Sequence, residues 1–191
     1  MPDSRTALRQ QLLQARQAWA ATEAAVAAQA RLNEHLLALL SQLEPEGLGL
    51  YWPIRGEFNP CPVAETLAGT LNLQRSLPHA FKGEGGAGRR MEYRVWDGQA
   101  PRAVDECGIA CSDGAKASPD VLLVPCVGFT RSGFRLGYGG GYFDRYMAAH
   151  PHVTAVGVAW DEALVDDTAF APQAHDQPLM LIVTPSGVVD A

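Results

Sequence analysis

A run of glycines close to an arginine, in the second half of the chain, has the composition of an anion-binding loop. Six glycines fall between residues 128 and 141, and Arg135 precedes the densest part, the segment GYGGG at 137–141. Four apolar residues before the run predict a buried strand that ends at Pro125, because proline cannot donate to a ladder. Residues 142–149 then have helical spacing. Backbone N–H groups can approach an anion closely where no Cβ intervenes, and a helix N-terminus favours negative charge.

The order of residues in this loop excludes two familiar phosphate motifs. A Walker A loop needs Gly-Lys-Ser/Thr, but the two lysines of the chain, Lys82 and Lys116, stand in other contexts. The dinucleotide pattern G-x-G-x-x-G fails because Tyr142 stands where its third glycine is required. From composition alone, a mobile surface loop remains an equal alternative.

Three other groups could bind a ligand. Arg5 and Arg9 lie four residues apart and share one face of a predicted helix, although such arginines are usually a solvated face. Glu57 follows a predicted strand, where open α/β sheets bind ligands, but an ordinary loop glutamate is an equal interpretation. A third group offers flat or adaptable apolar surface to a ring, although core packing explains each member as well: Met91, Tyr93 and Trp96.

The order of the residues at 125–145 is more specific than their composition. The pattern P-x-x-x-F followed by G-x-R-L-G-Y-G-G-G-Y-F-D-R closely resembles the signature of the 5-formyltetrahydrofolate cyclo-ligase family, also called methenyltetrahydrofolate synthetases. The resemblance extends, more loosely, over nearly the whole chain. It implies that ATP drives the cyclisation of 5-formyltetrahydrofolate to 5,10-methenyltetrahydrofolate, with release of ADP and phosphate through an iminium phosphate intermediate. ATP would be the co-substrate and Mg²⁺ the cofactor.

The resemblance also implies roles for individual residues. Arg135 would lie near the transferring phosphate and act in catalysis, and Asp144 would hold Mg²⁺ directly or through water. Asp144 also suits the first turn of a helix, where the dipole favours an acid. Glu57 would hydrogen-bond the pterin ring, and Met91 would contact the folate. The implied ATP- and phosphate-binding residues are Arg5, Arg9, Arg135, Leu136, Gly137, Tyr138, Gly139, Gly140, Gly141, Tyr142 and Phe143.

Several positions depart from the family pattern. Thr130 stands where an aspartate is common and removes a charge beside the predicted nucleotide loop, Phe143 replaces a tyrosine, and Pro185 replaces a frequent glutamate. In the His-Asp pair at 175–176, Asp176 could orient the histidine or the loop, and no catalytic role is assigned to it. Thr130 favours the alternative of a non-catalytic folate- or nucleotide-binding relative. A third reading, an enzyme that handles CoA or sugar phosphates, rests on fold analogy alone.

Length and composition predict one globular domain over residues 1–191. The net charge of −6 argues against nucleic acid as the main partner, and no apolar run reaches the length of a membrane span. Four cysteines without a C-x-x-C pair predict reduced thiols in a cytoplasmic protein, with a zinc site at Cys107 and Cys111 as the minor alternative. We expect a monomer or a weak dimer.

Apolar spacing predicts a helical pair over residues 1–44, packed on the rest of the domain. The first helix is marked by Leu8, Leu12, Ala15 and Trp19. The second runs from an N-cap at Thr22 to Leu43, and its predicted apolar side is Val26, Ala30, Leu37 and Leu40. Strands are predicted at 48–52, 76–78, 91–95, 154–160 and 179–184, with a helix at 62–71, a loop at 81–90 and irregular chain at 98–120.

Strands that alternate with helices predict a single α/β domain with a central, mostly parallel sheet flanked by helices. The family resemblance implies an architecture similar to that of sugar-phosphate isomerases and CoA transferases.

Overall fold

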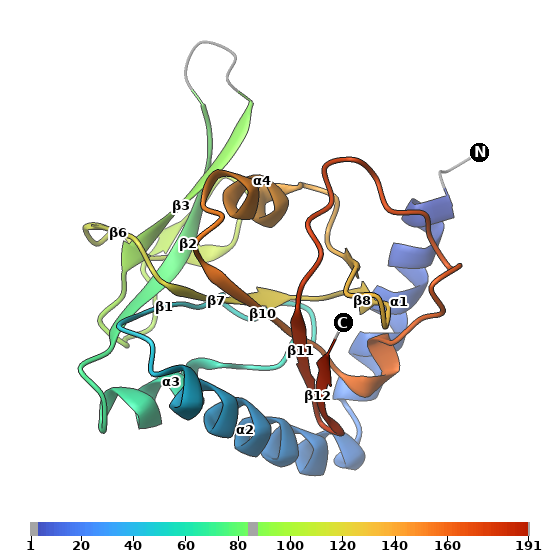
Figure 1. The fold of residues 1–191 in the computed structure, drawn as a ribbon, viewed down its shortest axis with the longest axis horizontal. Helices are drawn as coiled ribbons and strands as arrows, with labels where there is room; N and C mark the ends of the chain where they lie inside the picture. The colour runs from blue at the N-terminus through green and yellow to red at the C-terminus, as the bar shows by residue number, and fades with distance from the viewer. Residues whose placement is uncertain (1–3, 84–87, 191) are drawn as a thin grey trace.

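One eight-stranded sheet runs through the protein and organises the remaining elements (Figure 1). The computed structural model describes residues 4–83 and 88–190. The strand order is β12-β11-β10-β7-β1-β2-β3-β6. The strands from β11 to β2 are mutually parallel, whereas β12, β3 and β6 join the edges in antiparallel pairing. The prediction of a single α/β domain with a mostly parallel sheet is confirmed.

The sheet consists of β1 (Gly47–Gly49), β2 (Gln74–Lys82), β3 (Arg89–Val95), β6 (Lys116–Ala117), β7 (Val121–Pro125), β10 (Thr154–Val158), β11 (Leu181–Thr184) and β12 (Gly187–Asp190). Two short antiparallel ribbons lie outside it: β4 (Ala103–Val104) with β5 (Ala110–Cys111), and β8 (Gly128–Phe129) with β9 (Arg135–Leu136). The helices are α1 (Ser4–Ala20), α2 (Glu23–Leu43), α3 (Cys61–Ala68), α4 (Tyr142–Ala149) and the 3-10 turn η2 (Asp161–Ala163).

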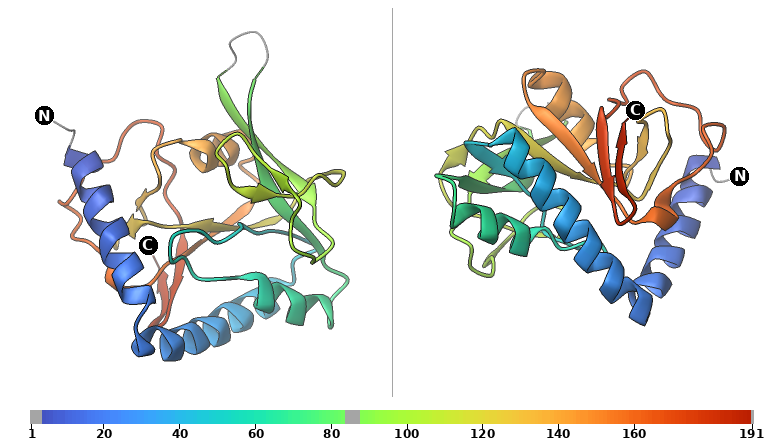
Figure 2. Two further views of the ribbon diagram at one scale, coloured as in Figure 1. Left: turned by 180° about the vertical axis from the view of Figure 1, so that it is seen from behind. Right: turned by 60° about the horizontal axis from the view of Figure 1, so that its bottom comes forward.

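Alternating side chains of the central strand β7 divide the core into two layers. Val121 and Leu123 pack in the layer that α2 and α3 cover, whereas Leu122 and Val124 pack in the layer under α4. Figures 1 and 2 show these helices on opposite faces of the sheet. A parallel strand buried on both faces requires a continuous apolar run, which explains the sequence of β7.

The first helix, α1, stands apart from these layers and packs across the end of the domain near β8 (Figure 2). Leu12 lies so close to Gly128 that a Cβ there would come within 2.6 Å of the leucine side chain. Trp19 packs against Trp160, with ring centroids 4.8 Å apart. These contacts orient α1 so that its arginines reach loops far away in the sequence.

The second helix has the predicted limits, but its buried face differs from the prediction. The buried stripe of α2 consists of Ala25, Ala28, Leu32, Leu36 and Leu40. Val26 is 73% exposed and Ala30 is also exposed, so both predicted core positions are wrong. Leu40 is buried as predicted and Leu37 packs, partly buried, against the core, so the prediction fails in the first half of the helix, where Ala25 and Ala28 are buried instead. On α1, Ala15 is likewise exposed.

Several predicted strand boundaries also need correction. The strand predicted at 76–78 is the nine-residue β2, and strand residues replace both ends of the loop predicted at 81–90, since β2 extends to Lys82 and β3 begins at Arg89. Residues 84–87 of that predicted loop lie outside the described residues. The strand predicted at 48–52 is limited to 47–49, and the stretch 98–120, expected to be irregular, contains β4, β5 and β6. The helix predicted at 142–149 is confirmed.

Two further findings concern membrane spans and the cysteines. Within the described ranges, no helix has the length and apolar character needed to cross a membrane. All four cysteines are free thiols, and burial raises the pKa of Cys61 and of Cys126 to about 11. The minor alternative of a zinc site receives no support, since no group of three or more potential metal ligands occurs among the residues that the structure describes.

The register of α2 predicts different outcomes for two substitutions on one helix. Leu36→Ala should lower the free energy of unfolding by about 2–5 kcal/mol, because the fully buried leucine leaves a cavity. Val26→Ala, the matched control at an exposed position, should change it by less than about 0.5 kcal/mol. Urea unfolding followed by circular dichroism measures both. Equal losses in the two variants would contradict the observed packing of α2.

Candidate functional site

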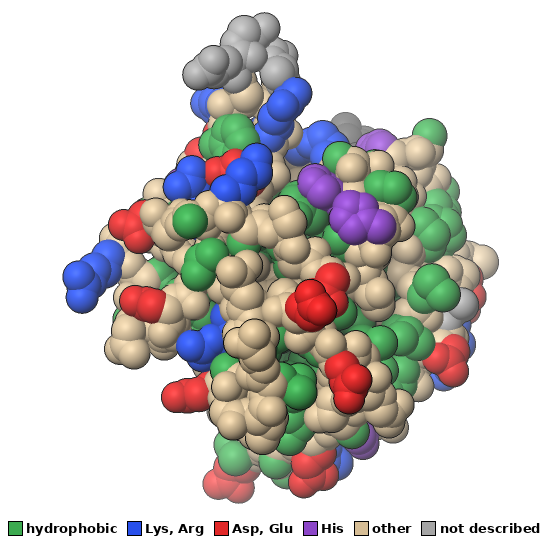
Figure 3. Space-filling view, turned by 60° about the vertical axis from the view of Figure 1, so that its left-hand side comes forward, with side chains coloured by type: hydrophobic (Ala, Val, Ile, Leu, Met, Phe, Trp, Pro, Cys, Tyr) green, Lys and Arg blue, Asp and Glu red, His purple; other side chains and the backbone are tan. Residues whose placement is uncertain are grey.

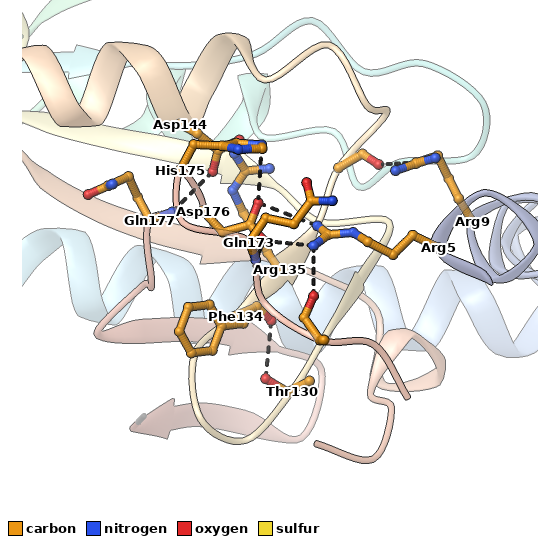
Figure 4. Close-up of polar contacts among 12 residues, drawn as sticks. Arg5, Arg9, Thr130, Phe134, Arg135, Asp144, Gln173, His175, Asp176 and Gln177 are labelled. Carbon is orange, nitrogen blue, oxygen red and sulfur yellow. Dashed lines mark hydrogen bonds and ion pairs between the residues drawn. The ribbon is translucent and has the colours of Figure 1, made fainter. Parts of the chain in front are cut away.

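The candidate site lies where chain segments leave the carboxyl ends of the parallel strands, the region in which open α/β sheets bind ligands. The segment after β1 contains Glu57, and the glycine loop (residues 137–141) follows β9. Side chains of α1 reach both segments. Figure 4 shows the part of the site around Arg5, Arg9 and Arg135.

Arginine side chains hold the glycine loop through its carbonyl groups. Arg9 Nε donates a hydrogen bond of 2.7 Å to the Gly137 carbonyl, and Arg145 donates one of 2.6 Å to the Gly140 carbonyl. Gly139 has a φ of +87°, and a Cβ at this position would lie 3.3 Å from the guanidinium carbon of Arg9. The loop therefore keeps bare backbone beside cationic groups, as an anion cradle requires.

Arg135 and Asp144, on either side of the glycine loop, form a buried ion pair with 3.0 Å between Nη2 and Oδ2. The Arg135 side chain is 5% exposed, and its guanidinium lies 5.7 Å from the ring centroid of Phe143. Asp144 also accepts a hydrogen bond of 3.3 Å from the backbone N–H of Gln177. The Nε of Arg135 is buried without a hydrogen-bond partner among the described residues. The two residues expected to meet phosphate and Mg²⁺ thus lie together, with one arginine donor unused.

Magnesium fits this arrangement only together with a nucleotide. Asp144 is the single predicted protein ligand, and its two oxygens already accept from Arg135 and Gln177. Mg²⁺ in phosphate-transferring sites commonly takes one or two carboxylates, with substrate phosphates and waters as the other ligands. Asp144 therefore suits contact through a metal-bound water, and it also keeps its position in the first turn of α4.

Arg5 is held in place by the loop that precedes β11 (Figure 4). Its Nη1 donates to the Asp176 carboxylate at 2.7 Å and to the Ala171 carbonyl at 3.0 Å. Although burial opposes the charged form, the hydrogen bonds from Arg5 and from the Gln173 backbone lower the pKa of Asp176. His175 is 65% exposed and 3.8 Å from the same carboxylate. Asp176 therefore orients Arg5, a role that the sequence did not indicate.

The carboxylate of Glu57 lies in a buried polar cluster. Its Oε1 accepts a hydrogen bond of 2.7 Å from the Tyr138 hydroxyl, and its Oε2 accepts one of 2.9 Å from the Ile54 backbone. Arg16 Nη1 lies 3.7 Å from Oε1, and another nitrogen of Arg16 donates to the Tyr138 hydroxyl. The Arg16 and Glu57 side chains are 5% and 4% exposed. Burial raises the pKa of Glu57, while Arg16, Ile54 and Tyr138 oppose this effect by stabilising the charge.

Thr130 occupies the turn between β8 and β9 and is buried. Its hydroxyl lies 3.0 Å from the Ser132 hydroxyl and 3.3 Å from the Phe134 carbonyl, which it donates to. Ser132 in turn donates to the carboxylate of Asp167 at 2.7 Å, and this bond lowers the pKa of Asp167. A carboxylate from a later segment therefore reaches the turn in which Thr130 replaces an aspartate.

The apolar candidates near β3 separate into two kinds. Tyr93 and Trp96 are buried parts of the core, so packing explains both of them. Met91 is partly buried and packs against the core layer under α4, opposite Ala80 of the neighbouring strand. Arg145 links this region to the glycine loop by donating a hydrogen bond of 2.9 Å to the carbonyl of Arg89. Figure 3 shows lysine and arginine side chains gathered over this hairpin.

Comparison with known proteins decides the family. A model of the 5-formyltetrahydrofolate cyclo-ligase family matches residues 2–185. The chain belongs to this family. The 5-formyltetrahydrofolate cyclo-ligase of Escherichia coli (strain K12) is 42% identical over 71 residues, which cover 36% of this chain and 38% of that protein. The protein of the same name from Mycolicibacterium smegmatis is 40% identical over 73 residues, 37% of this chain and 36% of that protein. The chain therefore aligns with well under half the length of these curated relatives.

Two solved structures have the same fold over almost their whole length. A 5,10-methenyltetrahydrofolate synthetase from Mycoplasma pneumoniae superposes with a TM-score of 0.73 at 23% identity, covering 97% of this chain and 99% of that one. At that identity the likeness concerns the fold alone. A 5,10-methenyltetrahydrofolate synthetase from Aquifex aeolicus superposes with a TM-score of 0.71 at 27% identity, covering 97% of this chain and 92% of that one. Cyclo-ligases and this protein therefore share one architecture.

Arg16, Arg145 and Asp176 of the candidate site were missed or left unassigned by sequence reasoning. The sequence could have indicated Arg16, because positions 5, 9 and 16 lie within about 40° of one another on a helical wheel and so share one helix face. Nothing in the sequence indicated the role of Asp176, since its partner Arg5 lies 171 positions away in the sequence.

Two glycines with positive φ provide a matched test of the anion cradle. Gly139→Ala should weaken Mg-ATP binding by roughly tenfold or more, because its Cβ would press against Arg9 and close the approach to the backbone. Gly108→Ala has similar backbone strain, with φ at +75°, but open space around the new Cβ. Both should lose about 1 kcal/mol of stability. Isothermal titration calorimetry that gives both variants the same Mg-ATP affinity would contradict the cradle.

Proposed function

We propose that the protein is an ATP-dependent 5-formyltetrahydrofolate cyclo-ligase. The observation that supports this most directly is the hydrogen bond between Tyr138, within the glycine loop, and the buried carboxylate of Glu57. This contact joins the glycine loop to a buried carboxylate, which supports a site that combines an anion cradle with an acceptor for a ring carrying N–H donors. A phosphate donor and a pterin bound to these two groups would meet in one site. Family membership supports the same proposal.

The reaction needs such a site because a formamide does not cyclise readily, its oxygen being a poor leaving group. The formyl oxygen of the substrate attacks the γ-phosphoryl group of ATP, which forms an N5-iminium phosphate and releases ADP. N10 then attacks the activated carbon, the ring closes, and the carbon–oxygen bond breaks as phosphate leaves. The protein must align the oxygen with the phosphorus and stabilise the charge of the transferring group.

The arginines provide that stabilisation. Arg9 borders the loop backbone, and Arg5 is fixed by Asp176 on the same helix face. Arg135 is fixed by Asp144, and its Nη1 lies beside Gly137, 2.7 Å from where a Cβ would stand, so it suits the catalytic contact with the transferring phosphoryl group. The remaining predicted phosphate contacts are Leu136, Gly137, Tyr138, Gly139, Gly140, Gly141, Tyr142 and Phe143.

Other parts of the proposal concern the folate, the metal and the cell. Glu57 would accept hydrogen bonds from the pterin amino and ring N–H groups, and Met91 would contact the folate. Mg²⁺, held through Asp144, would neutralise charge on the ATP phosphates. A cytoplasmic location is supported by four free thiols. A monomer or weak dimer that binds neither membrane nor nucleic acid remains our prediction.

The alternative function is a non-catalytic relative that binds folate or nucleotide. Thr130 favours it, because the expected aspartate is missing beside the loop. Asp167, hydrogen-bonded to Ser132 in the same turn, argues against it by supplying a carboxylate there.

Isotope labelling distinguishes these functions. The protein is incubated with Mg-ATP and 5-formyltetrahydrofolate that carries ¹⁸O in the formyl group. The absorbance of the conjugated product follows methenyl formation, and mass spectrometry measures the label in inorganic phosphate. We expect one labelled phosphate for each methenyl product, because the formyl oxygen becomes a phosphate oxygen.

Two other results would reject the proposal in different ways. Label that remains in the folate, or that appears in water, would exclude the phosphorylated intermediate. Binding of both ligands without folate-dependent ADP release would support the non-catalytic alternative.

A further inference from the structure

The Tyr138 hydroxyl donates a hydrogen bond to the Glu57 carboxylate, the group that is proposed to accept hydrogen bonds from the pterin. Oε1 accepts from Tyr138 at 2.7 Å, and Oε2 accepts from the Ile54 backbone at 2.9 Å. A pterin edge presents two adjacent donors, the amino group and a ring N–H, which together need a carboxylate with accessible lone pairs. The phenol therefore takes up one of the acceptor sites that such a pair of donors would use.

Displacing Tyr138 would not leave Glu57 without a partner. Arg16 Nη1 lies 3.7 Å from Oε1, and the Arg16 Nε is anchored to the Arg55 carbonyl at 3.1 Å. The charge of Glu57 thus keeps a fixed cation when the hydroxyl moves. This matters because a buried carboxylate that loses its only partner is strongly destabilised.

The position of Tyr138 in the chain connects this contact to the phosphate cradle. Tyr138 lies between Gly137 and Gly139, so little side-chain crowding resists a change in its backbone angles. The Gly137 carbonyl is the group that Arg9 binds. A shift of this backbone when phosphates bind would therefore also shift the phenol and lengthen its hydrogen bond to Glu57.

We propose that Tyr138 is a positioning residue that couples the two substrate subsites by competing with the pterin for Glu57. This inference rests on the proposed function. Folate displaces the phenol from Glu57, and phosphates that settle on the glycine loop withdraw the same phenol from the other side. Whichever substrate binds first breaks the Tyr138–Glu57 hydrogen bond, so the second substrate binds more tightly. Tyr138 thereby favours the complex that contains both substrates.

The coupling is measured by calorimetry with 5-formyltetrahydrofolate and a non-hydrolysable ATP analogue with Mg²⁺, each titrated alone and in the presence of the other. In the wild type, the presence of each ligand should lower the dissociation constant of the other by roughly tenfold, the usual effect of one hydrogen bond to a charged group. Tyr138→Phe should bind folate alone more tightly by a similar factor, and its coupling factor should fall to about one.

A second tyrosine provides the matched control. Tyr93 is buried, and its hydroxyl has no hydrogen-bond partner within the described ranges. Tyr93→Phe therefore removes a phenolic oxygen without touching Glu57, and it should keep the coupling of the wild type. A purely structural effect of losing a hydroxyl would alter stability but not the ratio of affinities.

The outcomes separate this inference from the proposed function. Wild-type protein that binds neither ligand would reject the proposed function and the inference together. Wild-type protein that binds both ligands, with the same coupling in Tyr138→Phe, would reject only the inference. Folate affinity that falls in Tyr138→Phe would also reject it, because the hydroxyl would then be a folate contact and not a competitor.

Discussion

Three arginines on one face of α1 hold together the loops from which the candidate site is built. Arg5 binds Asp176 before β11, Arg9 binds the Gly137 carbonyl in the glycine loop, and Arg16 lies against Glu57 after β1. Buried or half-buried charges are costly unless they are paired, so α1 must pack where these acceptors lie. The constraint is reciprocal, because the glycine loop has few side chains of its own and takes its position from Arg9 and Arg145.

This arrangement explains why a helix at the start of the chain belongs to a site formed mainly by its second half. The sheet supplies a rigid edge, with β1 and β7 as parallel neighbours whose carboxyl ends open on the same side. The loops beyond that edge supply bare backbone, one buried carboxylate and the Arg135–Asp144 pair. Helix α1 then adds cations, so the positive groups that a polyanionic substrate would need already lie around the glycine loop.

The sequence predicted the fold class, and it indicated the glycine loop of the candidate site, because those features depend on local patterns. The apolar run 121–124, Pro125, the glycines and the helix at 142–149 are adjacent, and each has a strong local preference. The prediction of the buried face of α2 was wrong at Val26 because this residue is as apolar as its buried neighbours. Only tertiary packing decides which stripe of the helix is covered. The Tyr138–Glu57, Arg16–Glu57 and Arg5–Asp176 contacts join residues 81, 41 and 171 positions apart, and no single sequence reveals such pairs.

The central claim is that the arginine face of α1 is part of a nucleotide site. The most direct test is the Mg-ATP affinity of Arg9→Ala, measured by calorimetry beside Arg31→Ala, which removes an exposed arginine from α2. We expect Arg9→Ala to weaken Mg-ATP binding by roughly ten- to a hundredfold, since a hydrogen bond to a charged group is worth about 1.5–3 kcal/mol. Arg31→Ala should bind as the wild type does. A folded Arg9→Ala protein with wild-type affinity for Mg-ATP would contradict the account.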